Sequence, residues 1–324
     1  MADIVLSHTQ ISMWRSCPRS YFFKYIAQRV PIVVDQKLSF GRLWDEATGV
    51  WWQDGIDAVR DWLIENAASM DEIDAIKIAT LIKYYQPPDS FDLISTQEKI
   101  DVPIRHPDTN EPMPGVMLRC KADSILDYNG GRFVREAKIT AKDIDGYGPF
   151  WQVLQANSQV GIYWLAFGAD GLVYDVAHKP GIKPSAADID AAASIMVPGY
   201  EEMNKAAQAH ARKGICQRDQ LNAYQVRMDK DVAENTDKYF QFRLVHKTEK
   251  DVRQAKEDLW AWASMMIVAR DKQWHPRNDH SCSSFFGTCP YLAVCSGTTT
   301  IEDESLYTAP DWAVDEKDEE RMPF

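Results

Sequence analysis

Hydrophobic and polar positions change their periodicity several times along this chain, and each change marks a new element. Residues 7–27 have a polar start and many aromatic residues, which predicts a helix that is bent at Pro18. Residues 40–95 contain few helix breakers and predict two or three helices that end near Pro87 and Pro88. Residues 97–140 alternate in short runs between turn-forming clusters, and therefore predict a β-meander.

The second half of the chain alternates helical and strand patterns. Helices are predicted at residues 150–167, 186–235 and 248–270, with an interruption near Pro198 and Gly199, and strands are predicted at residues 171–178 and 239–246. Strands mixed with helices in this order predict an α/β fold, in which helices flank a small mixed or mainly antiparallel central sheet. The helices within residues 50–95 are expected to form an insertion.

Composition bounds the class of protein. The chain has 324 residues, of which 45% are hydrophobic, so it can bury a sizeable core. It has no apolar run of about 18 residues and no secretory signal pattern, and we therefore expect a cytoplasmic protein without a membrane segment. Thiols stay reduced in that compartment, so the six cysteines are expected to be ligands or core residues rather than disulfides.

The net charge of −12 argues against a nucleic-acid partner, because phosphate contacts need Lys and Arg. The charge is unevenly distributed, however. Residues 301–324 contain nine acidic and two basic residues and carry −7, which leaves −5 for the first 300 residues. We expect this segment to be a disordered acidic tail. A basic groove can still exist on the mildly acidic remainder, where Arg15, Arg19, Lys24 and Lys142 are candidate phosphate contacts.

One predicted hairpin carries the strongest chemical signal. If Asn129 and Gly130 form a two-residue turn, which this pair strongly favours, Asp123 and Glu136 face each other across the two strands. Their β-carbons would then lie about 4.5–5.5 Å apart. Two carboxylates at that distance repel, and a divalent cation with oxygen ligands is the usual remedy.

Lys138 follows Glu136 by two positions, so its side chain emerges on the same face of the strand. An ammonium group beside a metal ion can orient the attacking water or neutralise the charge of a phosphate. The same pattern of residues also fits an ordinary solvent-exposed hairpin. The surrounding motifs decide between these two interpretations.

Six motifs occur in order along the chain: WRSCPRSYFFKY, FGRLWDEA, CKADSIL, REAKIT, QVGIY and CSSFFGTCPYLAVC. Together they resemble the RecB-like branch of the PD-(D/E)XK nuclease superfamily, which includes CRISPR-associated and phage exonucleases with an iron–sulfur cluster. The resemblance implies a restriction-endonuclease-like domain over residues 1–300. It also implies DNA as the partner and hydrolysis of phosphodiester bonds with Mg²⁺ or Mn²⁺, in the context of phage or mobile-element recombination, repair or replication.

The resemblance also assigns roles to individual residues. Asp123 and Glu136 would bind the metal ion, and Lys138 would position the nucleophile. Gln159 and Tyr163 match a Gln-x-x-x-Tyr motif and share one face of a helix, since they are four residues apart. Gln159 would help to hold the metal-bound water or a DNA phosphate. The alternative is that Gln159 and Tyr163 only satisfy polar edges of a buried helix.

This chain departs from the pattern of that branch at two positions. The Gly-x-x-x-His motif has Asp45 in place of its metal-binding histidine, and Glu46 would take that role if the register differs by one. A carboxylate here favours harder cations such as Mg²⁺, but the exchange can also mark weakened activity. The rival hypothesis is therefore a DNA-binding recombination accessory protein that retains the nuclease fold with little or no catalysis. The second departure is Cys120, which stands where a glycine often precedes the aspartate strand and is expected to affect packing.

Cys282, Cys289 and Cys295 fall within fourteen residues. Three closely spaced thiolates can form three corners of a tetrahedral site, and Cys17 would supply the fourth. The resemblance implies a [4Fe–4S] cluster that joins the two ends of the domain, and zinc is the alternative, with His275 or His280 as further ligands. Cys120 and Cys216 are expected to be packing residues.

Two further features concern partners. The chain contains no G-x-x-x-x-G-K-[ST] motif, so no ATP-driven motor is expected. Its last residues, acidic and then Pro-Phe, resemble the tip of bacterial single-stranded-DNA-binding proteins, which docks on replication and repair proteins. A solvated acidic tail without any partner is the alternative. A zinc-stabilised interaction protein without a role on DNA is a further rival for the whole chain.

Overall fold

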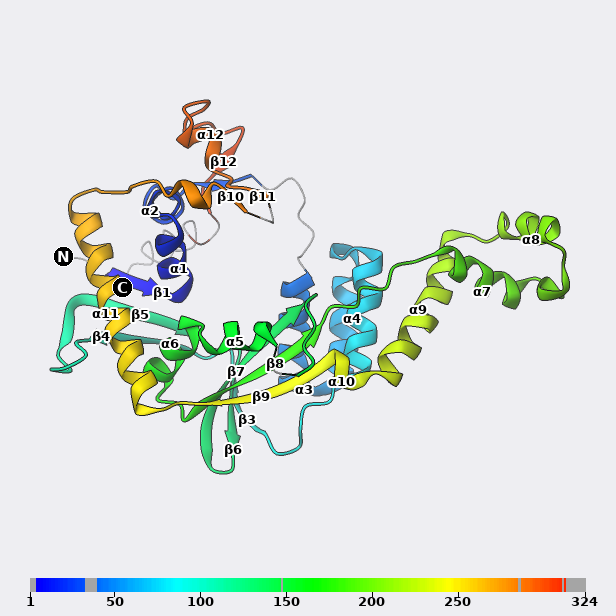
Figure 1. Cartoon of the computed structure of the whole chain (residues 1–324), viewed down its shortest axis with the longest axis horizontal. Helices are drawn as coiled ribbons and strands as arrows, with labels where there is room; N and C mark the ends of the chain where they lie inside the picture. The colour runs from blue at the N-terminus through cyan, green and yellow to red at the C-terminus, as the bar shows by residue number, and fades with distance from the viewer. Residues whose placement is uncertain (1–3, 33–39, 147, 285–286, 311, 313–324) are drawn as a thin grey trace, which may run out of the picture.

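The structure is a computed structural model, and it describes residues 4–32, 40–146, 148–284, 287–310 and 312. A five-stranded sheet with the order β3-β6-β7-β8-β9 lies at its centre (Figure 1). The strands are β3 (Asp92–Thr96), β6 (Ser124–Tyr128), β7 (Gly131–Thr140), β8 (Gly171–His178) and β9 (Phe240–His246). β7 and β8 are parallel, and the other neighbours are antiparallel. The expected α/β fold with a mixed central sheet is confirmed.

A second sheet connects the start of the chain to its middle. It contains β1 (Ile4–Ser7), β5 (Pro112–Lys121) and β4 (Lys99–Arg105), with β1 parallel and β4 antiparallel to β5. The β-meander predicted over residues 97–140 is divided between the two sheets, because β5 ends at Lys121 and β6 begins at Ser124 in the other sheet. Residues 122 and 123 therefore carry the chain from one sheet to the other.

Both faces of the central sheet are covered, because side chains of β8 alternate between two hydrophobic cores. Leu172, Tyr174 and Val176 lie in the first core, whereas Val173 and Ala177 lie in the second. The first core includes α6 (Ser158–Phe167) and α11 (Glu249–Asp271); the second includes α3 (Phe40–Asn66), α4 (Glu72–Tyr84) and α9 (Gln217–Glu234). Burial on both faces explains why β8 is hydrophobic along almost its whole length.

The helical insertion expected at residues 50–95 is instead a covering layer of the sheet, formed by α3 and α4, and β3 follows it. The helices that project from the body lie between β8 and β9 (Figure 1). They are α7 (Ala186–Met196) and α8 (Lys205–Arg212), and α9 and α10 (Thr236–Tyr239) lead back to the sheet. The short helix α5 (Pro149–Gln155) precedes α6. None of the described helices combines the length and the apolar character that a bilayer crossing requires.

The N-terminal helix is interrupted where the sequence predicts only a bend. α1 (His8–Ser16) ends before Cys17, whose backbone is extended at φ −158°, and α2 (Pro18–Tyr21) then begins with proline at its first position. A π-helical turn, Phe22–Ile26, completes the segment. Side chains on α1 and α2 therefore do not share one helical face.

The C-terminal part packs against this N-terminal segment. β10 (Ser283–Ser284) pairs with β11 (Gly287–Thr288), and α12 (Leu292–Cys295) follows. β12 (Tyr307–Thr308) pairs with β2 (Val30–Pro31), and Tyr307 is only 3% exposed. The acidic tail expected from residue 301 therefore does not begin there, because residues 307 and 308 are held in a sheet. The terminal Pro-Phe lies outside the described residues.

Candidate active site

The Asn129-Gly130 turn sets the geometry of the predicted hairpin. Both residues have positive φ, 54° and 80°, as a type I′ turn requires. The pairing of Tyr128 with Gly131 continues without a shift to Ser124 opposite Arg135. The predicted register is confirmed over this ladder, and it brings Asp123 to the end of the ladder beside the strand that carries Glu136.

Asp123 lies in the short crossing between the two sheets, and both its backbone and its side chain are held there. Its carbonyl oxygen accepts a hydrogen bond of 3.0 Å from the backbone N–H of Gln97. Its Oδ2 accepts a hydrogen bond of 2.9 Å from the backbone N–H of Ala137. The carboxylate is thereby fixed next to β7, and its second oxygen remains available for a further contact.

Glu136 and Lys138 share one face of β7, as their spacing predicts. The ammonium group of Lys138 contacts Glu136 Oε1. Glu136 is 4% exposed, whereas the side chain of Lys138 is 33% exposed. A buried carboxylate and a half-buried ammonium group thus lie together on β7, the middle strand of the sheet.

Tyr163 and Gln159 reach the same carboxylate from α6. The hydroxyl of Tyr163 donates a hydrogen bond of 2.7 Å to Glu136 Oε2, and Gln159 Nε2 donates one of 2.7 Å to the Tyr163 hydroxyl. Burial, followed by the charges of Glu136 and Asp123, raises the pKa of Tyr163 well above its ordinary value. Tyr163 therefore acts as a fixed hydrogen-bond donor that orients Glu136.

Asp45 approaches the site from α3, one of the helices of the second core. Its Oδ1 is buried and has no hydrogen-bond partner among the described residues. Burial, and then the charge of Asp123, raises the pKa of Asp45 to about 6. Glu46 points elsewhere, because its Oε1 lies 2.6 Å from Arg42 Nε. Of the two candidates in this motif, Asp45 is the one whose carboxylate faces the site.

The three carboxylates concentrate negative charge in a mostly buried place. Burial, and then the charge of Glu136, raises the pKa of Asp123 to about 6, although Arg135 and Lys138 act in the opposite direction. Within the described ranges, no three His, Cys, Asp or Glu side chains are already arranged as a metal-binding group. The donors nevertheless fit a hard divalent cation, since all three are carboxylates and the buried Asp45 Oδ1 has no hydrogen-bond partner in the part of the chain that the structure describes.

A sequence model of the PD-(D/E)XK nuclease superfamily matches residues 5–296 of the chain. The chain belongs to this superfamily. No curated protein matches its sequence. The matched segment contains all of the site residues described above.

Two solved structures resemble this PD-(D/E)XK protein at low similarity. The "Putative exonuclease" of Eubacterium rectale has a TM-score of 0.42 and 10% identity, over 86% of this chain and 85% of that one. The protein SSO0001 has a TM-score of 0.26 and 14% identity, over 55% of this chain and 64% of that one. The family assignment rests on the sequence model and not on these two structures.

A buried arginine lies behind the carboxylates of this PD-(D/E)XK protein, and the sequence gives no sign of it. Arg135 is fully buried in β7, and its Nε lies 2.7 Å from Asp175 Oδ2 on β8. Tyr85 also donates to Asp175, and Trp52 Nε1 donates a hydrogen bond of 2.8 Å to the Tyr85 hydroxyl. The positive charge of Arg135 lowers the pKa of both Asp45 and Asp123, against the larger effect of burial. Arg135 is therefore the main buried counter-charge to the site.

Arg15 and Arg19, two of the candidate phosphate contacts, do not lie together in the structure. Arg15 Nη1 donates a hydrogen bond of 3.3 Å to Ser158 Oγ on α6. Arg19 Nε instead donates one of 2.6 Å to the backbone carbonyl of His275. Because the chain is extended at Cys17, these two arginines point to different parts of the molecule, and only Arg15 lies near the site.

The four cysteines of the predicted cluster gather where the two ends of the described chain meet. Cys17, Cys282, Cys289 and Cys295 are all free thiols. Burial raises the pKa of Cys295, Arg19 opposes this, and the thiols of the other three raise it further, which shows that they lie within electrostatic reach. The backbone N–H of Cys289 donates a hydrogen bond of 2.9 Å to the carbonyl of Cys282.

This junction is held by hydrogen bonds as well as by packing. Asn278 Nδ2 and the Ser281 hydroxyl both donate to the carbonyl of Ser16, each at 2.8 Å. The hydroxyl of Tyr291 donates a hydrogen bond of 2.8 Å to the carbonyl of Arg29. Over the described ranges the cysteines are not arranged as a preformed metal-binding group, so a bound cluster is not shown.

The other two cysteines differ from each other. Cys120 is 4% exposed and packs in the first core, as expected. Cys216 is exposed, and its thiol donates a hydrogen bond of 2.9 Å to Asp219 at the start of α9. The prediction of a packing role was therefore wrong for Cys216, because this residue lies exposed just before the first residue of α9.

Proposed function

We propose that this PD-(D/E)XK protein is a deoxyribonuclease that hydrolyses phosphodiester bonds with Mg²⁺ or Mn²⁺. One observation carries the proposal: Asp123 lies within electrostatic reach of both Asp45 and Glu136, beside Lys138, and the buried Asp45 Oδ1 has no hydrogen-bond partner among the described residues. A cluster of this kind is unfavourable without a cation. The three carboxylates would hold the ion.

The residues of the chain would then divide the work as follows. A divalent cation held by these carboxylates would lower the pKa of a bound water and would neutralise charge on the phosphate. Lys138 orients the attacking water and neutralises charge on the scissile phosphate. Tyr163 fixes the orientation of Glu136 through its 2.7 Å hydrogen bond, and Gln159 fixes Tyr163 in turn. The buried positive charge of Arg135 reduces the repulsion among the three carboxylates.

We further propose exonucleolytic cleavage and a place in the RecB-like branch, in phage or mobile-element recombination, repair or replication. The order of the six motifs over residues 7–296 supports this assignment, and residues 1–300 would form the nuclease domain. The terminal Pro-Phe would dock on a replication or recombination partner. These functions rest on resemblance, and an ATP requirement is not expected.

The four gathered thiols support a [4Fe–4S] cluster between Cys17, Cys282, Cys289 and Cys295, with zinc as the alternative. Thiolates are the usual ligands of such clusters. Iron and zinc should be measured in protein purified without oxygen, for wild type and for Cys17→Ser. Cys216→Ser is the matched control, because Cys216 is an exposed thiol on another helix. Iron that is present in wild type and in Cys216→Ser but lost in Cys17→Ser would support the cluster. Zinc with the same pattern would support the zinc site. If wild type contains neither metal, both hypotheses are wrong.

One observation favours a second candidate function, that of a DNA-binding accessory protein with weak or no catalysis. Asp45 replaces the histidine of the motif and adds a negative charge to a buried site. An added negative charge makes the carboxylates of the ion-free site harder to ionise, and this weakens their arrangement around a metal ion. The two candidates differ in whether bound DNA is cut.

A cleavage assay separates the candidates. End-labelled single- and double-stranded DNA, linear and circular, should be incubated with protein and Mg²⁺, Mn²⁺ or EDTA. We expect metal-dependent shortening of linear DNA by wild type, its loss in Lys138→Ala, and its retention in Lys230→Ala, an exposed lysine of α9. Binding without cleavage would support the accessory protein instead. Cleavage of circles would contradict the exonuclease assignment.

A further inference from the structure

Two side chains of α1 converge on the start of α6, next to the site. A hydrogen bond of 3.2 Å joins His8 Nε2 to Ser158 Oγ, and Arg15 Nη1 donates to the same oxygen at 3.3 Å. His8 and Arg15 are seven positions apart on α1, and Ser158 is the first residue of α6. The next residue of α6 is Gln159, which belongs to the chain of hydrogen bonds that reaches Glu136.

Arg15 brings a positive charge to this point. Arg15 has no carboxylate partner among the described residues; its guanidinium lies 4.1 Å from the centroid of the Trp262 ring on α11. Burial, and then the charges of Lys138 and Arg15, lowers the pKa of His8 to about 4. Lys138 and Arg15 therefore both act on one imidazole, so the active-site lysine lies within electrostatic reach of this cluster.

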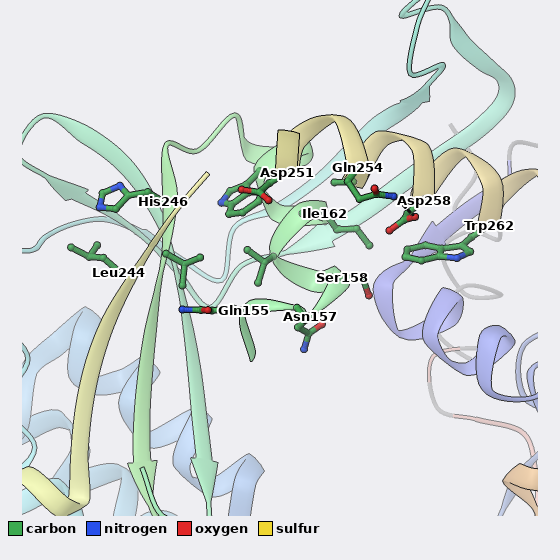
Figure 2. A pocket seen from close by; sticks show the side chains of 16 residues that line it. Gln155, Asn157, Ser158, Ile162, Leu244, His246, Asp251, Gln254, Asp258 and Trp262 are labelled. Carbon is green, nitrogen blue, oxygen red and sulfur yellow. Dashed lines mark hydrogen bonds between the residues drawn. The ribbon is translucent and has the colours of Figure 1, made fainter. Parts of the chain in front are cut away.

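A pocket of about 490 Å³ opens beside the cluster, between the start of α6, the end of β9 and the first half of α11. In Figure 2, Ser158 and Trp262 both lie at the end of this pocket that faces α1. The pocket also contains two carboxylates, Asp251 and Asp258, on α11. Asp251 accepts hydrogen bonds at the start of its own helix and Asp258 accepts one from Gln254. Figure 2 shows Asp258 beside Trp262, so these charges disfavour an anion along α11 and leave the side of the pocket with Ser158, which Arg15 contacts, as the place for one.

We propose that Arg15, His8 and Ser158 form a binding site for a phosphate group of the DNA strand, next to Lys138. Arg15 supplies a permanent charge with parallel donors, which suits phosphate oxygens. The Ser158 hydroxyl and the N-terminus of α6 supply further donors and a favourable dipole. This inference rests on the proposed nuclease function and adds to it a contact outside the metal-binding carboxylates.

Such a site would fix the position of the DNA strand. A strand held by one phosphate here and by its scissile phosphate beside Lys138 has a fixed register relative to the three carboxylates. Arg15 would be a positioning residue, since it does not touch the reacting atoms. The phosphate can be an internal diester of the strand or the monoester at its end, and the chemistry of recognition is the same for both.

Equilibrium binding in EDTA tests the site without cleavage. A fluorescent single-stranded oligonucleotide should be titrated with wild type, Arg15→Ala, Arg15→Lys and Arg60→Ala at several salt concentrations. Arg60 is the matched control, because it is an exposed arginine of α3 that pairs with the exposed Asp57. Loss of one charged phosphate contact should weaken binding about tenfold, and should reduce the slope of log K against log salt by about 0.7.

The variants give distinct outcomes. Arg15→Ala should lose both affinity and salt slope, Arg15→Lys should keep the slope because it keeps the charge, and Arg60→Ala should match wild type. A merely structural role would change the melting temperature and leave the slope unchanged. If Arg15→Ala binds with the affinity and slope of wild type, the phosphate site is wrong.

Three forms of the probe distinguish the source of the phosphate. If the site takes a terminal monoester, wild type should bind one phosphorylated end more tightly than a hydroxyl end, and Arg15→Ala should abolish that preference. If the site takes an internal diester, wild type should bind phosphorylated and hydroxyl ends equally. Arg15→Ala should then lose as much affinity for a circular strand as for a linear one. If wild type cuts DNA and Arg15→Ala binds DNA as wild type does, the phosphate site is wrong and the nuclease function stands. Wild type that neither binds nor cuts DNA removes both.

Discussion

Replacing Asp45 by Asn should stabilise the metal-free protein at neutral pH. In the folded chain the pKa of Asp45 is raised from 3.8 to about 6, first by burial and then by Asp123. A shift of about two pKa units corresponds to about 3 kcal/mol. Asp45 is partly exposed, so solvent screening reduces this to about 1–2 kcal/mol. The melting temperature should therefore rise by about 2–6 °C.

The gain should depend on pH in a defined direction. A carboxyl group whose pKa is higher in the folded than in the unfolded chain stabilises the fold while it is protonated. That contribution is fully present below about pH 4, the unfolded pKa, and is lost as the pH rises through about 6. Wild type and Asp45→Asn should therefore melt at similar temperatures near pH 4.5 and diverge towards pH 7.5.

Thermal melting in EDTA and in Mn²⁺ measures both parts of the prediction. Asp54→Asn is the control, because Asp54 is an exposed carboxylate of the same helix. Mn²⁺ should stabilise wild type and Asp54→Asn, and it should stabilise Asp45→Asn much less, since one ligand is missing. Equal or lower stability of Asp45→Asn at pH 7.5 in EDTA would refute the view that burial and the charge of Asp123 disfavour ionised Asp45 in the empty site.

Three further substitutions test the surroundings of the site. Lys138→Ala should lower the cleavage rate by about 10²–10⁴-fold, and a rate equal to that of wild type would exclude Lys138 from catalysis. Tyr163→Phe removes the 2.7 Å hydrogen bond to the buried Glu136, and should cost about 1–3 kcal/mol in urea unfolding; no loss of stability would contradict the orienting role. Arg135→Met leaves Asp175 buried without its partner and should cost about 3–5 kcal/mol, whereas Arg253→Met, at an exposed pair, should cost less than about 1 kcal/mol in the same experiment.

Local patterns predicted the hairpin that carries the site. Asn129 and Gly130 determine a two-residue turn, and a turn of fixed length determines which residues face each other. The register from Ser124 opposite Arg135 followed from these two residues alone. The shared face of Glu136 and Lys138 followed from the two-residue period of a strand.

Features that depend on distant contacts were not predictable in this way. The break between β5 and β6 depends on hydrogen bonds from residues 97 and 122, which bring a neighbouring strand into place. The buried pair of Arg135 and Asp175 joins two strands across forty positions of the sequence. Nothing in the local pattern distinguishes a buried arginine in a strand from an exposed one.

The N-terminal segment shows how one backbone angle can change the interpretation of charges. Arg15 and Arg19 would project together on a continuous helix. The extended backbone at Cys17 separates them, so that one lies near the carboxylates and the other near the cysteines. The role of Cys17 at the junction could be predicted as a contact between the two ends, but the arrangement of the arginines could not.

The most direct test of the central claim is the position of a bound Mn²⁺ ion, located by its anomalous scattering in crystals of the protein. We predict an anomalous peak among Asp45, Asp123 and Glu136, with carboxylate oxygens about 2.0–2.6 Å from the ion. A peak elsewhere in the molecule, or none in crystals soaked with Mn²⁺ at neutral pH, would contradict the claim that these three side chains hold the metal.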